Sequence, residues 1–231
     1  MIKVGVFENI KTMNSRIDEL CKKNGRSRND ITLIAVTKTK PVPLLKEAQN
    51  AGEINFGENR PQEIVKKFPE FENIKWHLIG QLQKNKVKHI IDKVELIHSV
   101  DSISLAIEID KRAKQINKVQ DVLIQVNITG EESKSGVYPE DAEELIREIS
   151  LLENIRVKGL MTISKKEFSF DENKKVFKSL RELSKKIDAL NIENISMQEL
   201  SMGMTHDFEA AIEEGATMIR VGTAIFGARD V

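Results

Sequence analysis

The N-terminal segment has the pattern of an amphipathic helix. Its apolar residues recur at alternating steps of four and three, and the positions between them are mainly charged or polar. This spacing places one apolar stripe along a helix that ends near Gly25. The residues of the stripe are Val6, Ile10, Met13, Ile17 and Leu20.

Eight short runs rich in Ile, Val and Leu follow, and they alternate with amphipathic stretches. Repetition of strand and helix requires crossover connections, and eight such strands close most economically into a parallel barrel. The expected strands are residues 31–37, 53–56, 75–79, 95–100, 121–128, 156–161, 196–200 and 217–221. The expected helices are residues 43–51, 60–68, 83–92, 103–116, 139–151, 171–190 and 208–214.

We therefore predict a single domain over residues 1–231, a (β/α)8 TIM barrel with an additional N-terminal helix, residues 1–25, packed on it. The chain stops at Val231, soon after the eighth strand, which leaves room for no more than a turn of helix there. The N-terminal helix would then cover the flank that a final helix would have filled. A doubly wound open sheet is the alternative, because periodicity alone cannot show closure.

Composition and charge narrow the classes of partner. The 36 Lys and Arg residues balance the 36 Asp and Glu residues, which removes the electrostatic argument for nucleic acid or an anionic bilayer as the main partner. The one cysteine, Cys21, cannot form an internal disulfide, and we expect it to be buried. No apolar run is long enough to span a bilayer, and the first residues do not resemble a signal peptide. We expect a cytoplasmic protein with no membrane or nucleic-acid partner.

Lys38 is the sharpest chemical candidate, because functional groups in parallel α/β folds collect where strands end. Alternation along the first strand places Ile34, Val36 and Lys38 on one face, which would direct a lysine toward the barrel mouth. Partial burial and the like charge of Lys40 would favour the neutral amine, which can attack an aldehyde and form an imine. The alternative is that both lysines cap the strand and face water.

The ends of the last two strands suggest an anion site. Residues 201–204 precede a helix that we expect to begin at Thr205 or His206, where free amide groups favour an anion. Gly222 and Thr223 follow the eighth strand, the place where barrels commonly bind a phosphate. Taken separately these residues read as a helix cap and a turn, but together they describe a phosphate cup.

Arg220 is expected to point into the barrel. It alternates with Met218 and Gly222 along the eighth strand, so that the residues between them face the helices. A buried guanidinium stays protonated and demands a partner, and it can donate to a ring nitrogen only if that nitrogen is unprotonated. The alternative partner is a barrel carboxylate such as Glu199 or Glu58.

Several distinctive blocks occur in order from the first strand to the C-terminus. They are Ala35-Val36-Thr37-Lys38-Thr39-Lys40-Pro41, Phe56-Gly57-Glu58-Asn59, residues 76–86, Ser133-Lys134-Ser135-Gly136, Gly159-Leu160-Met161-Thr162, Leu200-Ser201-Met202-Gly203-Met204 and residues 220–227. These blocks resemble the pyridoxal phosphate homeostasis proteins, also called the YggS or PROSC family, and the resemblance covers nearly the whole chain.

This resemblance implies a barrel of the alanine racemase type, PLP fold type III, with pyridoxal 5'-phosphate (PLP) held as a covalent imine on Lys38. It places Asn59 near the cofactor and Arg220 at the pyridine nitrogen. Thr205 stands where the family commonly has Ser, and the hydroxyl is kept. The resemblance further assigns the phosphate to Ser201, Gly222 and Thr223, with Met202 and Gly203 lining the same loop.

The resemblance also implies a PLP carrier that takes part in intracellular vitamin B6 homeostasis, with no catalytic residues and no strong activity of its own. Racemases of this fold use a second base, a Tyr from an additional domain, for which we see no counterpart. We expect Tyr138 in a loop before a helix that starts at Pro139. An unprotonated pyridine nitrogen beside Arg220 would also weaken the ring as an electron sink. We expect a monomer that contacts PLP-dependent apoenzymes transiently.

Two enzyme classes remain as alternatives, a PLP-dependent amino acid racemase with slow turnover and a Schiff-base aldolase acting on a phosphorylated sugar. A pure interaction protein, with Lys38 merely structural, is the weakest alternative. The histidines lack the clustered spacing of a metal site, so we expect hydrogen-bonded or surface imidazoles and no metal. Lys134 is a further candidate, as a second aldehyde acceptor or a relay at the barrel mouth. The histidines are His77, His89, His98 and His206.

Overall fold

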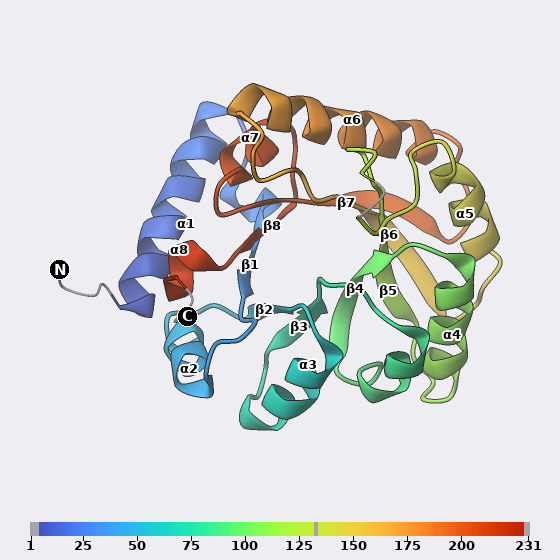
Figure 1. The fold of residues 1–231 in the computed structure, drawn as a ribbon, viewed down its shortest axis with the longest axis horizontal. Coiled ribbons are helices and arrows are strands. Elements are labelled where there is room, and N and C mark those ends of the chain that lie inside the picture. Colours follow the sequence, from blue (N-terminus) through green and yellow to red (C-terminus); the bar gives the residue numbers. More distant parts are fainter. Residues whose placement is uncertain (1–4, 132–133, 229–231) are drawn as a thin grey trace.

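The computed structural model describes residues 5–131 and 134–228, and these form a closed barrel of eight parallel strands in sequence order (Figure 1). The predicted barrel is confirmed, and each predicted apolar run overlaps a strand. The first and last strands pair from Thr32 with Met218 to Ala35 with Val221, which excludes the open sheet. The strands are β1 (Thr32–Val36), β2 (Asn55–Glu58), β3 (Lys75–Leu78), β4 (Val94–Val100), β5 (Gln120–Gln125), β6 (Ile155–Met161), β7 (Ile195–Met204) and β8 (Met218–Val221).

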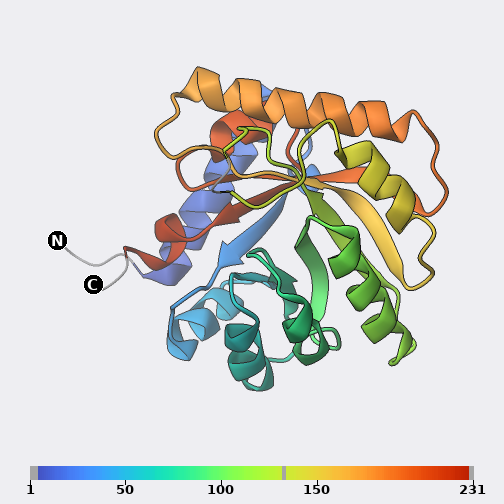
Figure 2. The same ribbon diagram turned by 45° about the vertical axis from the view of Figure 1, so that its right-hand side comes forward.

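The helices lie outside the strands, as Figure 2 shows from a second direction. Among the described residues, no helix is long and apolar enough to cross a membrane. The α-helices are α1 (Val6–Lys23), α2 (Val42–Asn50), α3 (Pro61–Lys67), α4 (Ile103–Lys114), α5 (Ala142–Ile149), α6 (Phe170–Asp188), α7 (Phe208–Glu213) and α8 (Thr223–Phe226). Three short 3-10 helices are η1 (Arg28–Asp30), η2 (Phe68–Glu70) and η3 (Lys84–His89).

Strand alternation divides the apolar side chains between two cores. A small cluster from alternate strand positions fills the barrel interior, while the larger core lies between the strands and the helices. Along β8, for example, Met218 belongs to the interior cluster and Ile219 and Val221 belong to the outer core, as the sequence predicted. The interior cluster consists of Ile34, Leu96, Leu123, Met161 and Met218.

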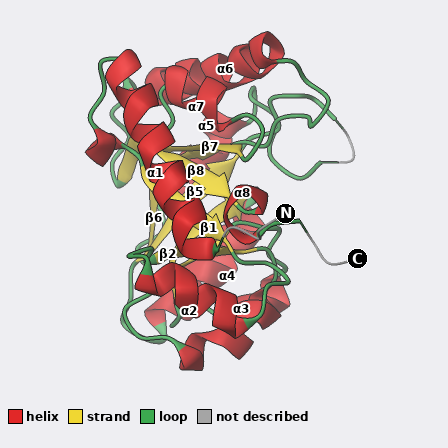
Figure 3. Ribbon diagram, turned by 90° about the vertical axis from the view of Figure 1, so that its left-hand side faces the viewer, coloured by secondary structure: helices red, strands yellow, loops and turns green. Residues whose placement is uncertain are grey.

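Helix α1 covers the flank beside β8 and β1. It packs against α2, α7 and α8, and Figure 3 shows it crossing this side of the barrel. Asn9 donates to the carbonyl of Ile225 in α8 at 2.8 Å, which ties the two helices together. Four of the five stripe residues are buried, Leu20 is half-buried, and the predicted burial of Cys21 is confirmed. The predicted role of this helix is therefore confirmed.

Some element boundaries differ from those predicted. The expected helix 83–92 contains only a 3-10 helix, Lys84–His89, in which the Lys86 amide donates to the Gln83 carbonyl at 2.9 Å. Strand β7 continues to Met204, because its end pairs with Arg220 after a shift in register. Helix α7 begins at Phe208, which confirms the start of the expected helix 208–214 and not a start at residue 205 or 206. Helix α5 begins at Ala142 rather than at residue 139.

Candidate functional site

Lys38 lies in a tight turn directly after β1, at the carboxyl edge of the barrel. The amide of Lys40 closes this turn by donating to the carbonyl of Thr37 at 3.0 Å, and the Lys38 side chain is half-buried. Thr39 has a left-handed φ of 61°, which costs a β-branched residue roughly 1–3 kcal/mol. Other contacts must therefore hold the turn that contains the candidate amine.

A buried cluster of charged residues supplies those contacts. The ammonium of Lys67, in α3, donates to the carbonyl of Thr37 at 2.8 Å and to carboxylate oxygens of Glu58 at 2.6 Å and Glu63 at 2.9 Å. Glu63 accepts the amide of Thr39 at 2.7 Å, and Glu58 accepts the Thr37 hydroxyl at 2.6 Å. We call Glu58, Lys67 and Glu63 the clamp, because together they bind the backbone on both sides of Lys38.

The two carboxyl groups of the clamp differ in electrostatic environment. Burial raises the pKa of Glu58, and this effect outweighs the hydrogen bonds from Lys67 and Thr37. Burial also disfavours the Glu63 carboxylate, but the donors Lys67 and Thr39 outweigh it and hold the pKa of Glu63 below its usual range. The turn is thus anchored through Glu63, which is the more readily ionised of the pair.

The side chain of Lys40 binds backbone carbonyls at the end of the C-terminal helix. Its ammonium donates to the carbonyl of Phe226, the last residue of α8, at 3.1 Å, and to those of the next two residues, Gly227 at 3.2 Å and Ala228 at 2.9 Å. A cation at a helix C-terminus satisfies carbonyl groups that have no partner within the helix. Lys40 therefore fastens the C-terminal helix to the turn after β1.

The ends of β1 and β8 lie against each other. A Cβ atom on Gly222 would lie 3.3 Å from the Val36 Cβ and 3.4 Å from the Val36 carbonyl oxygen, so the two backbones are in close contact there. Lys38 lies two residues beyond Val36, and Thr223 follows Gly222 as the first residue of α8. The sequence-predicted amine and the glycine end of β8 are therefore brought to the same part of the barrel edge.

Arg220 is buried inside the barrel, as strand alternation predicted. Its guanidinium donates to the Ser201 hydroxyl at 2.5 Å and to the Thr162 carbonyl at 2.8 Å. Burial lowers the pKa of Arg220 to about 10, which leaves it protonated at neutral pH, and the charge of Asp207 opposes the shift. Within the described residues no ion pair joins Arg220 to a carboxylate, so the alternative with Glu199 or Glu58 is wrong.

Glu58 and Glu199, the two carboxylates considered as partners of Arg220, bind other groups. Glu58 belongs to the clamp, and Glu199 accepts the Thr217 hydroxyl at 2.5 Å. Arg220 therefore makes its hydrogen bonds to neutral oxygens and uses only part of its donor set, since a guanidinium carries five N–H groups.

The end of β7 differs from the predicted helix-start anion site. Gly203 has a left-handed φ of 91°, and the carboxylate of Asp207 accepts the Met204 amide at 2.5 Å. Asp207 is buried at the start of α7, so a negative charge already lies where an anion would approach that helix. Thr205 is half-buried and lies between Gly203 and Asp207 in the sequence. It lines a cavity between α1, α7 and α8, with Met13 and Ala224 among the other lining residues.

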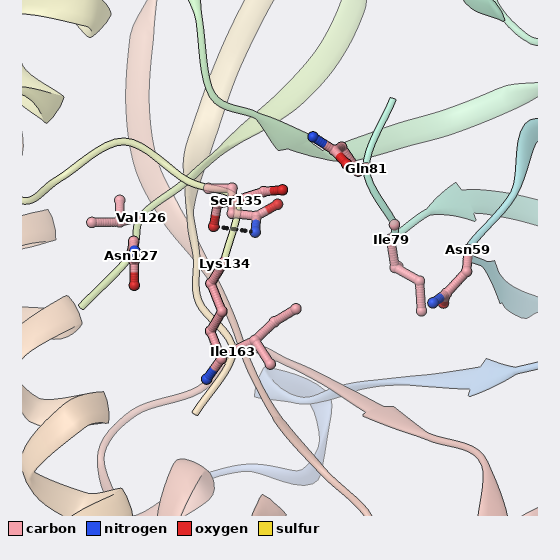
Figure 4. Close-up of a pocket in the computed structure, with 10 residues that line it drawn as sticks. Asn59, Ile79, Gln81, Val126, Asn127, Lys134, Ser135 and Ile163 are labelled. Carbon is pink, nitrogen blue, oxygen red and sulfur yellow. Dashed lines mark hydrogen bonds between the residues drawn. The ribbon is translucent and has the colours of Figure 1, made fainter. Parts of the chain in front are cut away.

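A second cavity, of about 260 Å³, lies at the same edge above β2, β3 and β5. Asn59 and Ile79 line one side of it, and Asn127, Lys134 and Ser135 line the other (Figure 4). Lys134 pairs with Glu131 and donates to the Ser164 carbonyl at 3.4 Å. The preceding motif residue, Ser133, lies outside the described residues. The cavity extends the candidate site from Asn59 across the barrel mouth.

Comparison with known proteins identifies the family of this chain. The family model of the alanine racemase N-terminal domain matches residues 10–230. A pyridoxal phosphate homeostasis protein of Aquifex aeolicus is 46% identical over 225 residues, which cover 96% of this chain and 97% of that relative. The chain belongs to the pyridoxal phosphate homeostasis protein family. A further relative with that name, from Escherichia coli strain K12, is 37% identical over 231 residues, with 97% of each chain covered.

Solved structures agree with the family assignment. PipY of Synechococcus elongatus, in a structure with PLP bound, superposes with a TM-score of 0.85 at 32% identity, covering 96% of this chain and 100% of PipY. An alanine racemase of Clostridium difficile has a TM-score of 0.77 at 19% identity and covers 97% of this chain but 58% of the racemase. The second similarity supports the predicted alanine racemase type of barrel.

The structure brings most predicted residues of the homeostasis family site to one edge. Lys38, Gly222 and Thr223 meet at the ends of β1 and β8, and Asn59 lies at the adjacent end of β2. Ser201 differs from these, because it is fully buried and its hydroxyl contacts both Arg220 and the Nδ1 of His98 at 2.9 Å. The predicted contact of Ser201 with a phosphate stays a prediction.

Tyr138 and the four histidines, which the sequence analysis also considered, lie in a loop, in the barrel interior or on the surface. Tyr138 lies in a loop, as predicted, and 41% of it is exposed. His77 and His98 are buried and hydrogen-bonded to each other, while His89 and His206 are exposed. The clamp residue Lys67 was missed because nothing in the sequence marks an exposed-looking helix lysine as the partner of a strand end 30 residues earlier.

Proposed function

We propose that this protein binds PLP at the carboxyl edge of the barrel, with the amine of Lys38 as the covalent attachment point, and takes part in PLP homeostasis without a strong catalytic activity. The contact between Val36 and Gly222 carries this proposal, because it brings the Lys38 turn beside the end of β8. PipY, a relative of the same family fold, contains PLP in its solved structure. The names of the curated relatives support the role in homeostasis.

The residues at this edge fit the three chemical parts of PLP. Lys38 supplies an amine for the aldehyde, and Arg220 retains N–H donors for an unprotonated pyridine nitrogen. For the phosphate we propose the backbone of Gly203 and Gly222 together with the hydroxyl groups of Thr223 and Thr205. Ser201 then acts through Arg220. Asn59 completes the set proposed around the cofactor, while Met202, which the resemblance placed in the same loop, is buried in the core between the strands and the helices.

Reversible attachment suits a carrier. When PLP is bound, its aldehyde condenses with a primary amine and releases one water molecule, and hydrolysis or exchange with another amine reverses the bond. The clamp fixes the backbone on both sides of Lys38, so this amine keeps one position at the barrel mouth. The half-buried position of Lys38 leaves it accessible from solution.

The environment of Arg220 argues against strong racemase chemistry. A guanidinium that is protonated at neutral pH can only donate, and it therefore favours a pyridine nitrogen without a proton. An unprotonated pyridine ring is a weaker sink for electrons from a substrate carbon. We propose that the protein retains PLP with little turnover of amino acids.

The attachment is tested with purified protein, PLP and borohydride. The wild type should show the visible absorption of a PLP imine, and reduction should leave a mass label on the peptide that contains Lys38. Lys38→Ala should lose both signals, while Lys134→Ala, a half-buried lysine at the same edge, should keep them. A label that stays after Lys38→Ala would overturn the assignment.

The distinction from an enzyme needs a separate measurement. Protein loaded with PLP should exchange the α-hydrogen of free amino acids for deuterium no faster than the same concentration of free PLP, while added apoenzyme should gain activity as PLP is transferred. Exchange at an enzymatic rate would instead favour the racemase-like alternative. The Lys38→Ala variant serves as the control for both measurements.

A further inference from the structure

A chain of polar side chains crosses the barrel interior behind Arg220. It runs from Asn55 at the start of β2 through His77 in β3, His98 in β4 and Ser201 in β7 to Arg220 in β8. The contacts are His77 Nε2 to Asn55 Oδ1 at 3.3 Å, His77 Nδ1 to His98 Nε2 at 3.0 Å, His98 Nδ1 to Ser201 Oγ at 2.9 Å and Arg220 Nη1 to Ser201 Oγ at 2.5 Å. Apart from Asn55, these residues are buried.

The chemistry of Arg220 favours one arrangement of protons along these side chains. A guanidinium only donates, so Ser201 Oγ must accept from Arg220, and its own proton is free to be donated to His98 Nδ1. His98 therefore carries its proton on Nε2 and donates it to His77 Nδ1. The same order leaves the His77 proton on Nε2.

The contact of Asn55, at the opposite end of this row of side chains, independently places the His77 proton on Nε2. The Asn55 amide oxygen only accepts, so His77 Nε2 must carry a proton to make that contact. Every contact between Asn55 and Arg220 then pairs one donor with one acceptor, and both imidazoles are neutral. Burial lowers the pKa of His77 to about 3 and that of His98 well below its usual value, which agrees with neutral rings.

We propose that His98, supported by His77, is a positioning residue that holds the Ser201 proton away from Arg220 and thereby orients the guanidinium toward the bound cofactor ring. This role rests on the proposed function. A protonated His98 would place a second donor against Ser201 Oγ and leave the serine proton without its acceptor. Asp207 also acts on the Arg220 charge, but at longer range and without an ion pair among the described residues.

The proton order is tested without cofactor. The chain contains four histidines, so nitrogen-15 NMR of the PLP-free protein should resolve each imidazole. His77 and His98 should both be Nε2–H tautomers that do not change between pH 5 and pH 8, and the exposed His89 and His206 serve as references. A proton on Nδ1 of His98, or protonation of either buried ring in this range, would overturn the proposal.

The effect on the cofactor is tested with substitutions. His98→Leu should weaken PLP binding by about ten- to a hundredfold, the loss expected for a hydrogen bond to a charged group, and should shift the pH at which the absorption of bound PLP changes. Borohydride should still label Lys38. His98→Asn, whose amide oxygen can accept the serine proton, should recover much of the loss, and His89→Leu should behave as the wild type.

A double substitution separates positioning from general packing. If His98 acts through Ser201, then Ser201→Ala together with His98→Leu should bind PLP no more weakly than Ser201→Ala alone. Additive losses, or an unchanged absorption profile in both His98 variants, would overturn the proposal. If His98→Leu does not fold, His98→Asn and Ser201→Ala supply the comparison. If the wild type binds no PLP, the proposed function and this positioning role both fall, while the NMR result still decides the proton order.

Discussion

The ammonium of Lys67 lies 2.8 Å from the carbonyl oxygen of Thr37, the residue directly before Lys38. This contact joins the helix after β2 to the turn after β1, and the same ammonium also neutralises Glu58 in a buried setting. Because Glu63 holds the amide of Thr39, the turn is bound on both sides of Lys38. The backbone position of the candidate amine therefore depends on the contacts of Lys67 and Glu63.

Lys67→Met should destabilise the protein and slow the attachment of PLP. Removal of one partner leaves Glu58 as a buried carboxylate without its cation, which costs about 3–5 kcal/mol. Urea unfolding measures the stability, and the rate of appearance of the visible absorption measures attachment. Lys66→Met is the control, because Lys66 is the exposed neighbour on the same helix.

A second substitution tests the cause of that effect. Glu58→Gln in the Lys67→Met background should recover part of the stability, since it removes the unpaired buried charge. The attachment rate should remain slow, because the carbonyl of Thr37 still lacks its donor. Equal stability of Lys67→Met and wild type would contradict the role of the clamp.

Gly203→Ala should damage both folding and PLP binding. The new Cβ would lie 2.6 Å from the Ala211 Cβ and 3.0 Å from the Phe208 Cα, and the φ of 91° is one that L-residues rarely adopt. Overpacking and backbone strain together should cost roughly 2–5 kcal/mol. Thermal unfolding and PLP titration measure the two effects. Gly5→Ala, where no atom lies within 4 Å of the new Cβ, should match the wild type, and a stable Gly203→Ala variant would refute the packing argument.

Glu53→Gln should make the protein relatively more stable above neutral pH. Burial raises the pKa of Glu53 from 4.5 to about 7, although the amide of Asn55 donates to its carboxylate at 2.8 Å. The folded state thus holds a proton that the unfolded chain releases between pH 4.5 and pH 7, so this group lowers stability as the pH rises through that window. The variant lacks this loss, and its gain over wild type from pH 4.5 to pH 8 should approach about 3 kcal/mol.

The measurement for Glu53 is urea unfolding of both proteins at pH 5 and pH 8. Glu72→Gln, which changes an exposed carboxylate, controls for the change in net charge. Parallel pH profiles for Glu53→Gln and wild type would show that Glu53 ionises normally in the fold.

His77→Phe should weaken the dependence of stability on acid pH. Burial lowers the pKa of His77 from 6.5 to about 3, so between these values the unfolded chain binds a proton that the folded state does not. Stability from this group is therefore present above pH 6.5 and is lost as the pH falls, by about 1.4 kcal/mol per pH unit. The variant should lose this slope in urea unfolding from pH 6.5 to pH 4, and His89→Phe should keep it. An unchanged slope in His77→Phe would mean that His77 is not held neutral.

Sequence periodicity was sufficient for the elements and for the inward direction of Arg220. Apolar runs and helical stripes reflect burial against any neighbour, so they are visible without knowledge of which neighbour it is. The boundaries at β7 and α7 were less predictable, because β7 is prolonged by pairing with β8 and not by its own composition. The same limit applies to the amphipathic stretch 83–92, in which the structure forms only the 3-10 helix η3.

The order of eight strands, the burial of the N-terminal stripe and the placement of Lys38 after a strand follow from local pattern, since each depends only on a residue and its near neighbours in the chain. Closure of the barrel and the partners of Arg220 and Lys67 were decided by tertiary structure. Ser201 and His98 are 103 residues apart and meet only because β4 and β7 face the same interior. Periodicity states which face of a strand is buried, but strand register across the closed barrel determines which side chains meet there.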